Sequence, residues 1–161
     1  MENIQVCIML GSKSDLDACQ KANDVFDKLG ISYEVVISSA HRTPDRTAEI
    51  AKALEGRGVK AVICMAGYAA HLPGVVAAYT KLPVIAVPLA GSPLNGLDAL
   101  YAQQMPAGVP VACMTIGNAG ATNAALFCAR MFATTDTQVN KKLADYIEDM
   151  KQKVIESSLQ K

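Results

Sequence analysis

Two histidines, the only ones among 161 residues, stand where proton transfer and anion binding could be combined. His41 lies beside Arg42 in segment 39–44, which reads Ser-Ala-His-Arg-Thr-Pro. A neutral imidazole exchanges protons near neutral pH, and a guanidinium offers a planar fork of donors for phosphate or carboxylate. The alternative is a surface arginine and a loop-filling histidine around a helix cap.

His71 lies in segment 66–74, which reads Ala-Gly-Tyr-Ala-Ala-His-Leu-Pro-Gly. The small residues let a ligand approach the backbone, and Pro73 marks a helix start just after the histidine. This histidine is therefore a second candidate for chemistry. The alternative is a hydrogen-bonded structural histidine packed in a loop of small residues.

A third candidate is segment 11–15, Gly-Ser-Lys-Ser-Asp. Two hydroxyls and the free amides of a helix start can hold a phosphate, and Asp15 could accept hydrogen bonds from ribose hydroxyls. The alternative is that Ser14 or Asp15 only caps the helix that follows.

Each candidate segment lies between an apolar run and a helix start. Thr43 followed by Pro44 is typical of an N-cap and first helical residue, so the Thr43 hydroxyl is expected to accept a hydrogen bond from an unpaired helix amide. His41 and Arg42 then occupy a strand-to-helix turn. The helix start disfavours the imidazolium, so we expect a neutral His41.

Runs of apolar residues with strand length alternate with helical periodicity along the whole chain. The pattern predicts strands over residues 4–10, 33–37, 59–65, 82–87 and 111–116, and helices over 16–29, 44 to about 55, 118–133 and about 136–158. This alternation predicts an α/β fold with a doubly wound parallel sheet in a single domain over residues 1–161, with residues 1 to about 133 as its core. Ligands bind at the carboxyl ends of such strands, so we expect the three segments to form one site for a phosphorylated small molecule.

The charge balance argues against nucleic-acid or membrane partners, because fifteen basic and fifteen acidic side chains cancel. No apolar stretch reaches membrane-spanning length and no signal core follows the N-terminus, so we expect a cytoplasmic protein. The five cysteines, at positions 7, 19, 64, 113 and 128, have no CxxC spacing and are expected to be core residues. We expect no metal dependence.

The helix expected over residues 118–133 has almost no polar face. A helix that is apolar all round is buried on all sides, which a single small domain seldom achieves. We therefore predict a homo-oligomer.

The ordered motifs G-S-K-S-D, S-A-H-R-T-P and A-A-H-L-P-G, followed by Gln104-Met105-Pro106 and Asn123-Ala124-Ala125, resemble the class I phosphoribosylaminoimidazole carboxylase family. These are the N5-carboxyaminoimidazole ribonucleotide mutases of purine biosynthesis, and the resemblance covers residues from about 6 to 133. It implies a three-layer flavodoxin-like domain with a central parallel sheet, assembled as an octamer. The implied isomerase converts its ribonucleotide substrate to the C4-carboxylated isomer without metal, ATP or biotin. It also implies a functional link to the ATP-dependent carboxylating enzyme of the preceding step.

The same resemblance assigns roles to individual residues. In the implied reaction the carbamate loses CO2, C4 attacks the retained CO2, and C4 then loses its proton to a histidine. His41 matches the proton-transfer histidine, and His71 is given a supporting role in positioning or carboxyl contact. The small, partly apolar loop 67–73 is expected to exclude water and retain CO2. The implied substrate contacts are Ser12, Asp15 and Arg42, with Ser14, Ser39, Ala40, Gly67 and Leu72 lining the site.

Four positions depart from the family pattern. Tyr68 stands where a second glycine is expected, Ala99 and Ala102 replace serines, and Asn118 replaces a lysine. Tyr68 matters most, because a phenol beside His71 could narrow the pocket or donate to a carboxylate.

Two alternatives stay open. The class II aminoimidazole ribonucleotide carboxylases use free CO2 and share the first two motifs, although A-A-H-L-P-G has the class I form. A non-enzymatic flavodoxin-like module is the other alternative. A phosphoryl-accepting receiver is disfavoured, since Leu10-Gly11 and Met65-Ala66 stand where acidic residues would be needed. A flavin binder using Tyr68 and Tyr101 would be coloured when purified.

Overall fold

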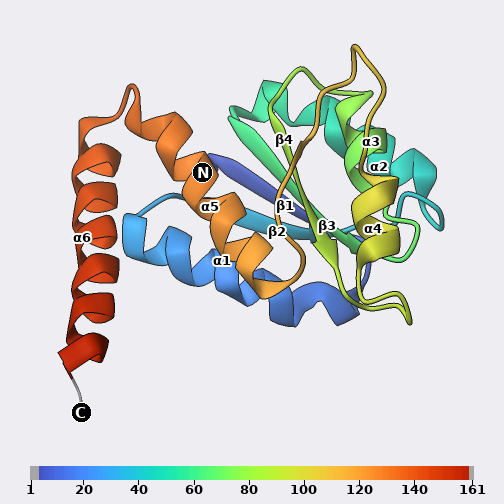
Figure 1. Ribbon diagram of the computed structural model, residues 1–161. Coiled ribbons are helices and arrows are strands. Elements are labelled where there is room, and N and C mark those ends of the chain that lie inside the picture. The colour runs from blue at the N-terminus through green and yellow to red at the C-terminus, as the bar shows by residue number, and fades with distance from the viewer. Residues whose placement is uncertain (1–3, 160–161) are drawn as a thin grey trace.

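The computed structural model describes residues 4–159, which form a five-stranded parallel sheet flanked by helices (Figure 1). Residues 1–3 and 160–161 of the predicted single domain lie outside the described residues. The strands follow the order β2-β1-β3-β4-β5, which is the flavodoxin-like order of a doubly wound sheet. Their bounds are β1 Val6–Leu10, β2 Tyr33–Ile37, β3 Ala61–Gly67, β4 Val84–Leu89 and β5 Ala112–Cys113. The predicted fold class is confirmed.

The helices form a layer on each face of the sheet (Figure 1). One layer holds α1 (Leu16–Leu29) and α5 (Asn118–Ala133), with α6 (Thr137–Leu159) packed against them. The other layer holds α2 (Pro44–Ala53), α3 (Leu72–Ala77) and α4 (Leu97–Ala102). Two short 3-10 helices, η1 (Lys13–Asp15) and η2 (Glu55–Arg57), flank α1 and α2. At six residues, α4 is too short to give a periodic pattern, and we did not predict it.

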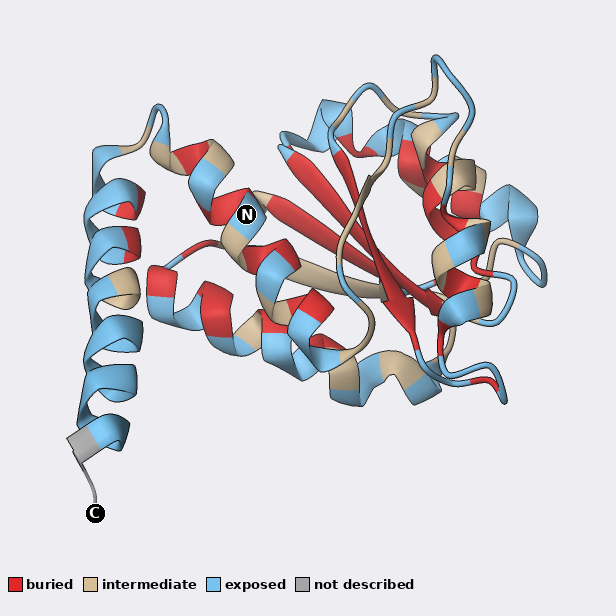
Figure 2. Ribbon diagram, in the orientation of Figure 1, coloured by how far each residue is buried: buried red, intermediate tan, exposed pale blue. Residues whose placement is uncertain are grey.

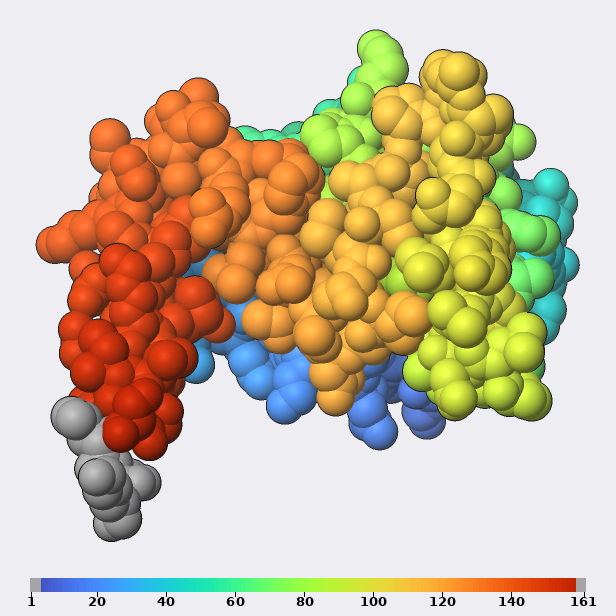
Figure 3. All heavy atoms as spheres, in the orientation of Figure 1, coloured from blue at the N-terminus to red at the C-terminus, as the bar shows by residue number. Residues whose placement is uncertain are grey.

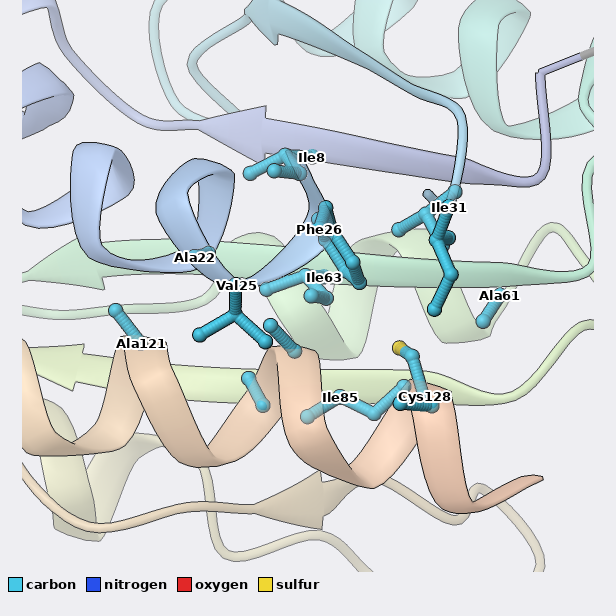
Figure 4. Packing of buried hydrophobic residues seen from close by; sticks show 14 of the residues in the cluster. Ile8, Ala22, Val25, Phe26, Ile31, Ala61, Ile63, Ile85, Ala121 and Cys128 are labelled. Carbon is cyan, nitrogen blue, oxygen red and sulfur yellow. The ribbon is translucent and has the colours of Figure 1, made fainter. Parts of the chain in front are cut away.

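The central strands are buried on both faces (Figure 2). Alternate side chains of β1 face opposite layers: Ile8 belongs to the core cluster that contains Phe26 of α1 and Cys128 of α5 (Figure 4), whereas Met9 belongs to the cluster under α2 and α3. Every residue of β1 has 0% exposure, as its continuous apolar run predicts.

Several predicted boundaries hold. Helix α1 ends where predicted, because Gly30 adopts a left-handed φ of 69° that suits glycine, and the amide of Ile31 returns to Phe26 O. Helix α2 begins at Pro44 but ends at Ala53, where the chain passes into η2.

The fifth strand is shorter than predicted. Residues 111–116 were expected to be extended, but only Ala112–Cys113 pair with β4. The amide of Met114 still donates to Ala86 O, but the next position of β4 that could return a hydrogen bond is Pro88, which has no N–H. A proline in the neighbouring strand thus limits this edge strand.

In the single chain α5 is buried on only part of its surface, and burial on all sides was expected only in a homo-oligomer. Gly120, Ala124 and Cys128 are among the residues that face the sheet and are buried. Phe127 is 39% exposed and lies along the helix between exposed Asn123 and Arg130. Asn123, Phe127 and Arg130 therefore form an exposed row along α5.

Helix α6 lies along the edge of the molecule. Val139 and Leu143 near its start are buried against the body, whereas Met150, Val154 and Ile155 are exposed. The last turns reach past the rest of the chain (Figure 3). None of the helices within residues 4–159 has the length and apolarity needed to cross a membrane.

The cysteines are core residues, as predicted, with one exception. Four are buried, and Cys113 is half-buried. Burial raises the pKa of the Cys19 thiol to about 11 and that of Cys128 to about 12, so neither ionises near neutral pH. We assign these thiols no chemistry.

Candidate active site

A pocket of about 1030 Å³ opens at the carboxyl ends of the strands. Its volume is at the upper limit of the roughly 300–1,000 Å³ typical of small-molecule sites. All ten predicted site residues line it, namely Ser12, Ser14, Asp15, Ser39, Ala40, His41, Arg42, Gly67, His71 and Leu72. Parallel strands that end at one edge of a sheet bring these distant segments together. The fold therefore unites the residues, and their individual roles stay predictions.

The two histidines contact one another directly. His41 Nε2 lies 2.9 Å from His71 Nδ1, and the rings meet edge to face with centroids 5.0 Å apart. One facing nitrogen must carry a hydrogen and the other must offer a lone pair, so at least one ring is neutral. The pair is suited to hold a proton and pass it on. Sequence reasoning placed both histidines at the site but did not predict this contact.

Arg42 lies beside this pair and joins two loops. Its Nη2 donates to Gly11 O at 3.0 Å, and its Nε donates to Ser39 Oγ at 3.3 Å. Arg42 forms no ion pair with any residue between 4 and 159. A positioned guanidinium without an anionic partner is suited to an anionic ligand.

The segment after β1 is a capping box. Ser12 Oγ accepts from the Ser14 amide at 3.4 Å, and Asp15 Oδ2 accepts from the Ser12 amide at 2.9 Å. The expectation that these amides are free for a phosphate is wrong, because the box already uses them. Ser12 is the N-cap residue of η1, and Asp15 completes the box from the N3 position; Asp15 is also the N-cap of α1, where its side chain makes no capping hydrogen bond. Burial raises the pKa of the Asp15 carboxyl, against the opposing effects of these hydrogen bonds and of Arg42.

Thr43 occupies the N-cap position of α2, as predicted, but it does not make the predicted hydrogen bond. Its side chain bonds no amide of the helix. Instead Oγ1 accepts from the Ser39 amide at 3.1 Å and donates to Ser39 O at 3.0 Å. The hydroxyl turns back into the loop, where both groups of Ser39 are within reach.

Tyr68 carries an unusual backbone conformation at the pocket wall. Its φ is 55°, in the left-handed region that favours glycine. Two tight hydrogen bonds follow, from the Ala70 amide to Tyr68 O and from the His71 amide to Ala69 O. The side chain is 60% exposed and its ring lies over Gly91. The residue that replaces an expected glycine thus keeps a glycine-like conformation.

The pocket also has walls that sequence reasoning missed. Leu89 ends β4 and is followed by Ala90 and Gly91, and Gly117 precedes α5, which begins at Asn118. The strand-end rule that located the other loops could have located these.

Of the remaining departures from the family pattern, Ala99 is fully buried and Ala102 is half-buried in the core beneath α4.

Gly74 of the A-A-H-L-P-G motif packs against Met105 of the Gln104-Met105-Pro106 motif. A Cβ on Gly74, the last residue of A-A-H-L-P-G, would lie 2.9 Å from Met105 Sδ. A larger residue at position 74 would require the end of the Met105 side chain to move. Within residues 4–159, no three His, Cys, Asp or Glu side chains are grouped so that they could hold a metal ion.

The model of the AIR carboxylase family matches residues 5–153 of this chain. This match spans nearly the whole described structure, including every loop of the pocket. The chain belongs to the AIR carboxylase family.

Relatives with assigned names agree with this membership. The chain is 48% identical to the N5-carboxyaminoimidazole ribonucleotide mutase of Bacillus subtilis, over 95% of each chain. It is 47% identical to the mutase of Thermotoga maritima, over 96% of this chain and 90% of the relative, and 43% identical to that of Escherichia coli K12, over 95% and 91%. In structure it is similar to PurE of Treponema denticola, with a TM-score of 0.86 and 31% identity over 98% of this chain and 99% of that chain.

Proposed function

We propose that this protein is an isomerase of purine biosynthesis that converts N5-carboxyaminoimidazole ribonucleotide to 4-carboxy-5-aminoimidazole ribonucleotide. The observation that carries the proposal is the pocket itself, in which a hydrogen-bonded histidine pair lies beside the Arg42 guanidinium, which forms no ion pair with any residue from 4 to 159. Membership of the AIR carboxylase family, with relatives named as mutases, supports this choice of substrate.

The reaction needs no oxidant or reductant. The N–C bond of the carbamate breaks and releases CO2, its electron pair stays on the nitrogen, and that nitrogen takes up a proton. C4 then attacks CO2, a C–C bond forms, and C4 loses its proton. The histidine pair can supply one proton and accept the other, with His41 at the reacting atoms and His71 orienting its ring.

The remaining pocket residues bind and enclose the substrate in this proposal. Arg42 takes the anionic end, and Ser12, Ser14 and Asp15 line the ribose phosphate side. Ala69, Ala70 and Leu72 form an apolar wall that holds CO2 beside the imidazole. Because the substrate is a carbamate, we also propose a functional link to an ATP-dependent carboxylating enzyme that makes it in the preceding step.

A paired assay tests the proposal. Purified protein is given N5-carboxyaminoimidazole ribonucleotide in one reaction and aminoimidazole ribonucleotide with bicarbonate in another. Turnover of the carbamate is the expected result. Turnover of the second mixture alone would assign the protein to the class II carboxylases instead.

We also propose that the chain acts as a homo-oligomer, with an octamer as the expected assembly. Apolar side chains exposed in the single chain support this, among them Phe127, Leu94 and Tyr101 at 39%, 60% and 70% exposure. Light scattering at micromolar concentration tests it, and a monomer mass would contradict it.

A further inference from the structure

A group of hydroxyls lies beneath the turn that carries His41. We call Ser38, Ser39, Thr43 and Thr47 the hydroxyl cluster. Ser38 and Thr47 are 2% and 0% exposed, and Ser38 Oγ lies 2.8 Å from Thr47 Oγ1. Neither they nor Thr43 line the pocket, so any effect on the reaction must pass through other residues.

Each hydroxyl can donate only one hydrogen bond, so the donor and the acceptor of each contact in this cluster can be assigned. Thr47 donates to Thr43 O at 3.0 Å, so the short contact with Ser38 requires Ser38 to donate to Thr47. Thr43 donates to Ser39 O at 3.0 Å. The 3.4 Å contact between Ser38 Oγ and Thr43 Oγ1 then has no hydrogen left to share. The chain of donors thus runs from Ser38 through Thr47 to Thr43.

These hydrogen bonds close the base of the turn. Ser39 and Thr43 are joined three times: the Ser39 amide donates to Thr43 Oγ1, and both the Thr43 hydroxyl and the Thr43 amide donate to Ser39 O. Ser38 is itself fixed to the sheet, since its amide donates to Leu10 O at 2.9 Å. Residues 40–42 form the tip above this closed base.

The two functional side chains of the tip depend on the base to different degrees. Arg42 has a second anchor outside the turn, in Gly11 O. The His41 ring makes no hydrogen bond within its own loop. Among residues 4–159 its one hydrogen-bond partner is His71. A shift of the turn therefore changes the alignment of His41 more than that of Arg42.

We propose that Thr47, together with Ser38, is a positioning residue for His41 in the reaction. Thr47 fixes Thr43, Thr43 fixes Ser39, and this closed base sets the direction of the His41 ring toward His71 and the substrate. The inference rests on the proposed function for its kinetic part and on the geometry alone for its structural part.

The decisive variant is Thr47→Val, which keeps the side-chain shape and removes the hydroxyl. We expect kcat to fall about 10- to 100-fold, as a misplaced reacting group would cause, and KM to change less than about threefold. Thr47→Ser restores the hydroxyl and should return kcat to within about threefold of the natural chain. The matched control is Thr134→Val, which removes a hydroxyl bonded to the Met131 carbonyl at the end of α5 and should change neither constant.

A second readout does not need turnover. The chain contains two histidines, so a protein labelled with 13C at histidine Cε1 gives two imidazole signals. Thr47→Val should move both signals, whereas Thr47→Ser and Thr134→Val should leave them in place. If the natural chain fails the paired-substrate assay, the proposed function fails and these signals still test the positioning.

The proposal is overturned if folded Thr47→Val keeps its imidazole signals and kcat. It is also overturned if Thr47→Ser loses as much as Thr47→Val, because the hydroxyl would then not be the cause. If Thr47→Val does not fold, Thr43→Val replaces it, because Thr43 is exposed. The same fall in kcat and the same movement of the imidazole signals are expected, and Thr43→Ser should restore both.

Discussion

The turn after β2 and the turn after β3 bring the two histidines into contact by different means. The first turn depends on a side chain: the Thr43 hydroxyl bonds both the amide and the carbonyl of Ser39, beside one backbone hydrogen bond from the Thr43 amide to Ser39 O. The second is closed by its backbone, with Tyr68 in a left-handed conformation and two tight amide-to-carbonyl hydrogen bonds leading to His71.

This difference predicts which kind of substitution each turn tolerates. Loss of the Thr43 hydroxyl should loosen the first turn, because it leaves only the backbone hydrogen bond from the Thr43 amide to Ser39 O. The second turn should tolerate changes of side chain but respond to changes in backbone freedom. Substitutions in the two turns can therefore separate chemistry, binding and stability.

The largest expected effect is on turnover, and it separates the two histidines. His41→Asn removes the group expected to move the proton, so kcat should fall about 10²- to 10⁴-fold while substrate binding is largely kept. His71→Asn keeps His41 and should cost less. Steady-state kinetics and calorimetric binding of the substrate measure both variants. Retained turnover in His41→Asn would refute the proton-transfer role.

The next effect is on binding and concerns the residue that joins the first turn to the loop after β1. Arg42→Ala removes the guanidinium and should raise KM about 10- to 100-fold, since hydrogen bonds to charged groups contribute about 1.5–3 kcal/mol. Arg46→Ala, an exposed arginine of α2 that does not line the pocket, is the control. Equal KM values for the two variants would argue against an anion-binding role for Arg42.

A smaller effect tests the backbone of the second turn. Tyr68→Gly relieves a left-handed conformation that costs a residue with a Cβ of order 1 kcal/mol or more, partly offset by the added freedom of the unfolded chain. We expect the free energy of unfolding to rise by about 0.5–1 kcal/mol in urea titrations. Tyr68→Ala also lacks the phenol but keeps the Cβ, and it should show no such gain. A gain in both variants would trace the effect to the exposed ring instead.

The smallest effect is a pH dependence of stability in the loop that Arg42 joins to the first turn. Burial raises the pKa of Asp15 above its ordinary value of 3.8, so the folded chain binds this proton more tightly than the unfolded chain. The contribution of Asp15 to stability therefore falls as pH rises from 3.8 through the raised pKa. Asp15→Asn keeps an oxygen for the Ser12 amide and does not titrate, so it should gain stability relative to the natural chain across this range. Urea titrations of both proteins at successive pH values measure the difference, and a constant difference would contradict the shift.

The order of the elements could be predicted from the sequence because it depends on local patterns. A 3.6-residue apolar period and Gly30 determine α1, and a continuous apolar run predicts that β1 is buried on both faces. The location of the site could be predicted as well. Parallel strands end at one edge of a sheet, so chemistry-bearing residues that each follow a strand must lie near one another.

The tertiary structure decided what depends on distances between separate segments. The contact between His41 and His71, thirty residues apart, follows from the strand order β2-β1-β3 and from two unrelated turn geometries. The shortening of β5 opposite Pro88 and the exposed row of α5 likewise depend on neighbours that no local pattern identifies.

Hydrogen-bond partners were also decided in three dimensions. The sequence placed Thr43 at a helix start and Ser12 in a polar loop, and both positions are correct. Each hydroxyl then had several amides and carbonyls within reach but only one hydrogen to donate. Which partner it bonds depends on the folded positions of those groups, and this determines whether a helix-start threonine caps its helix or closes the turn that holds His41.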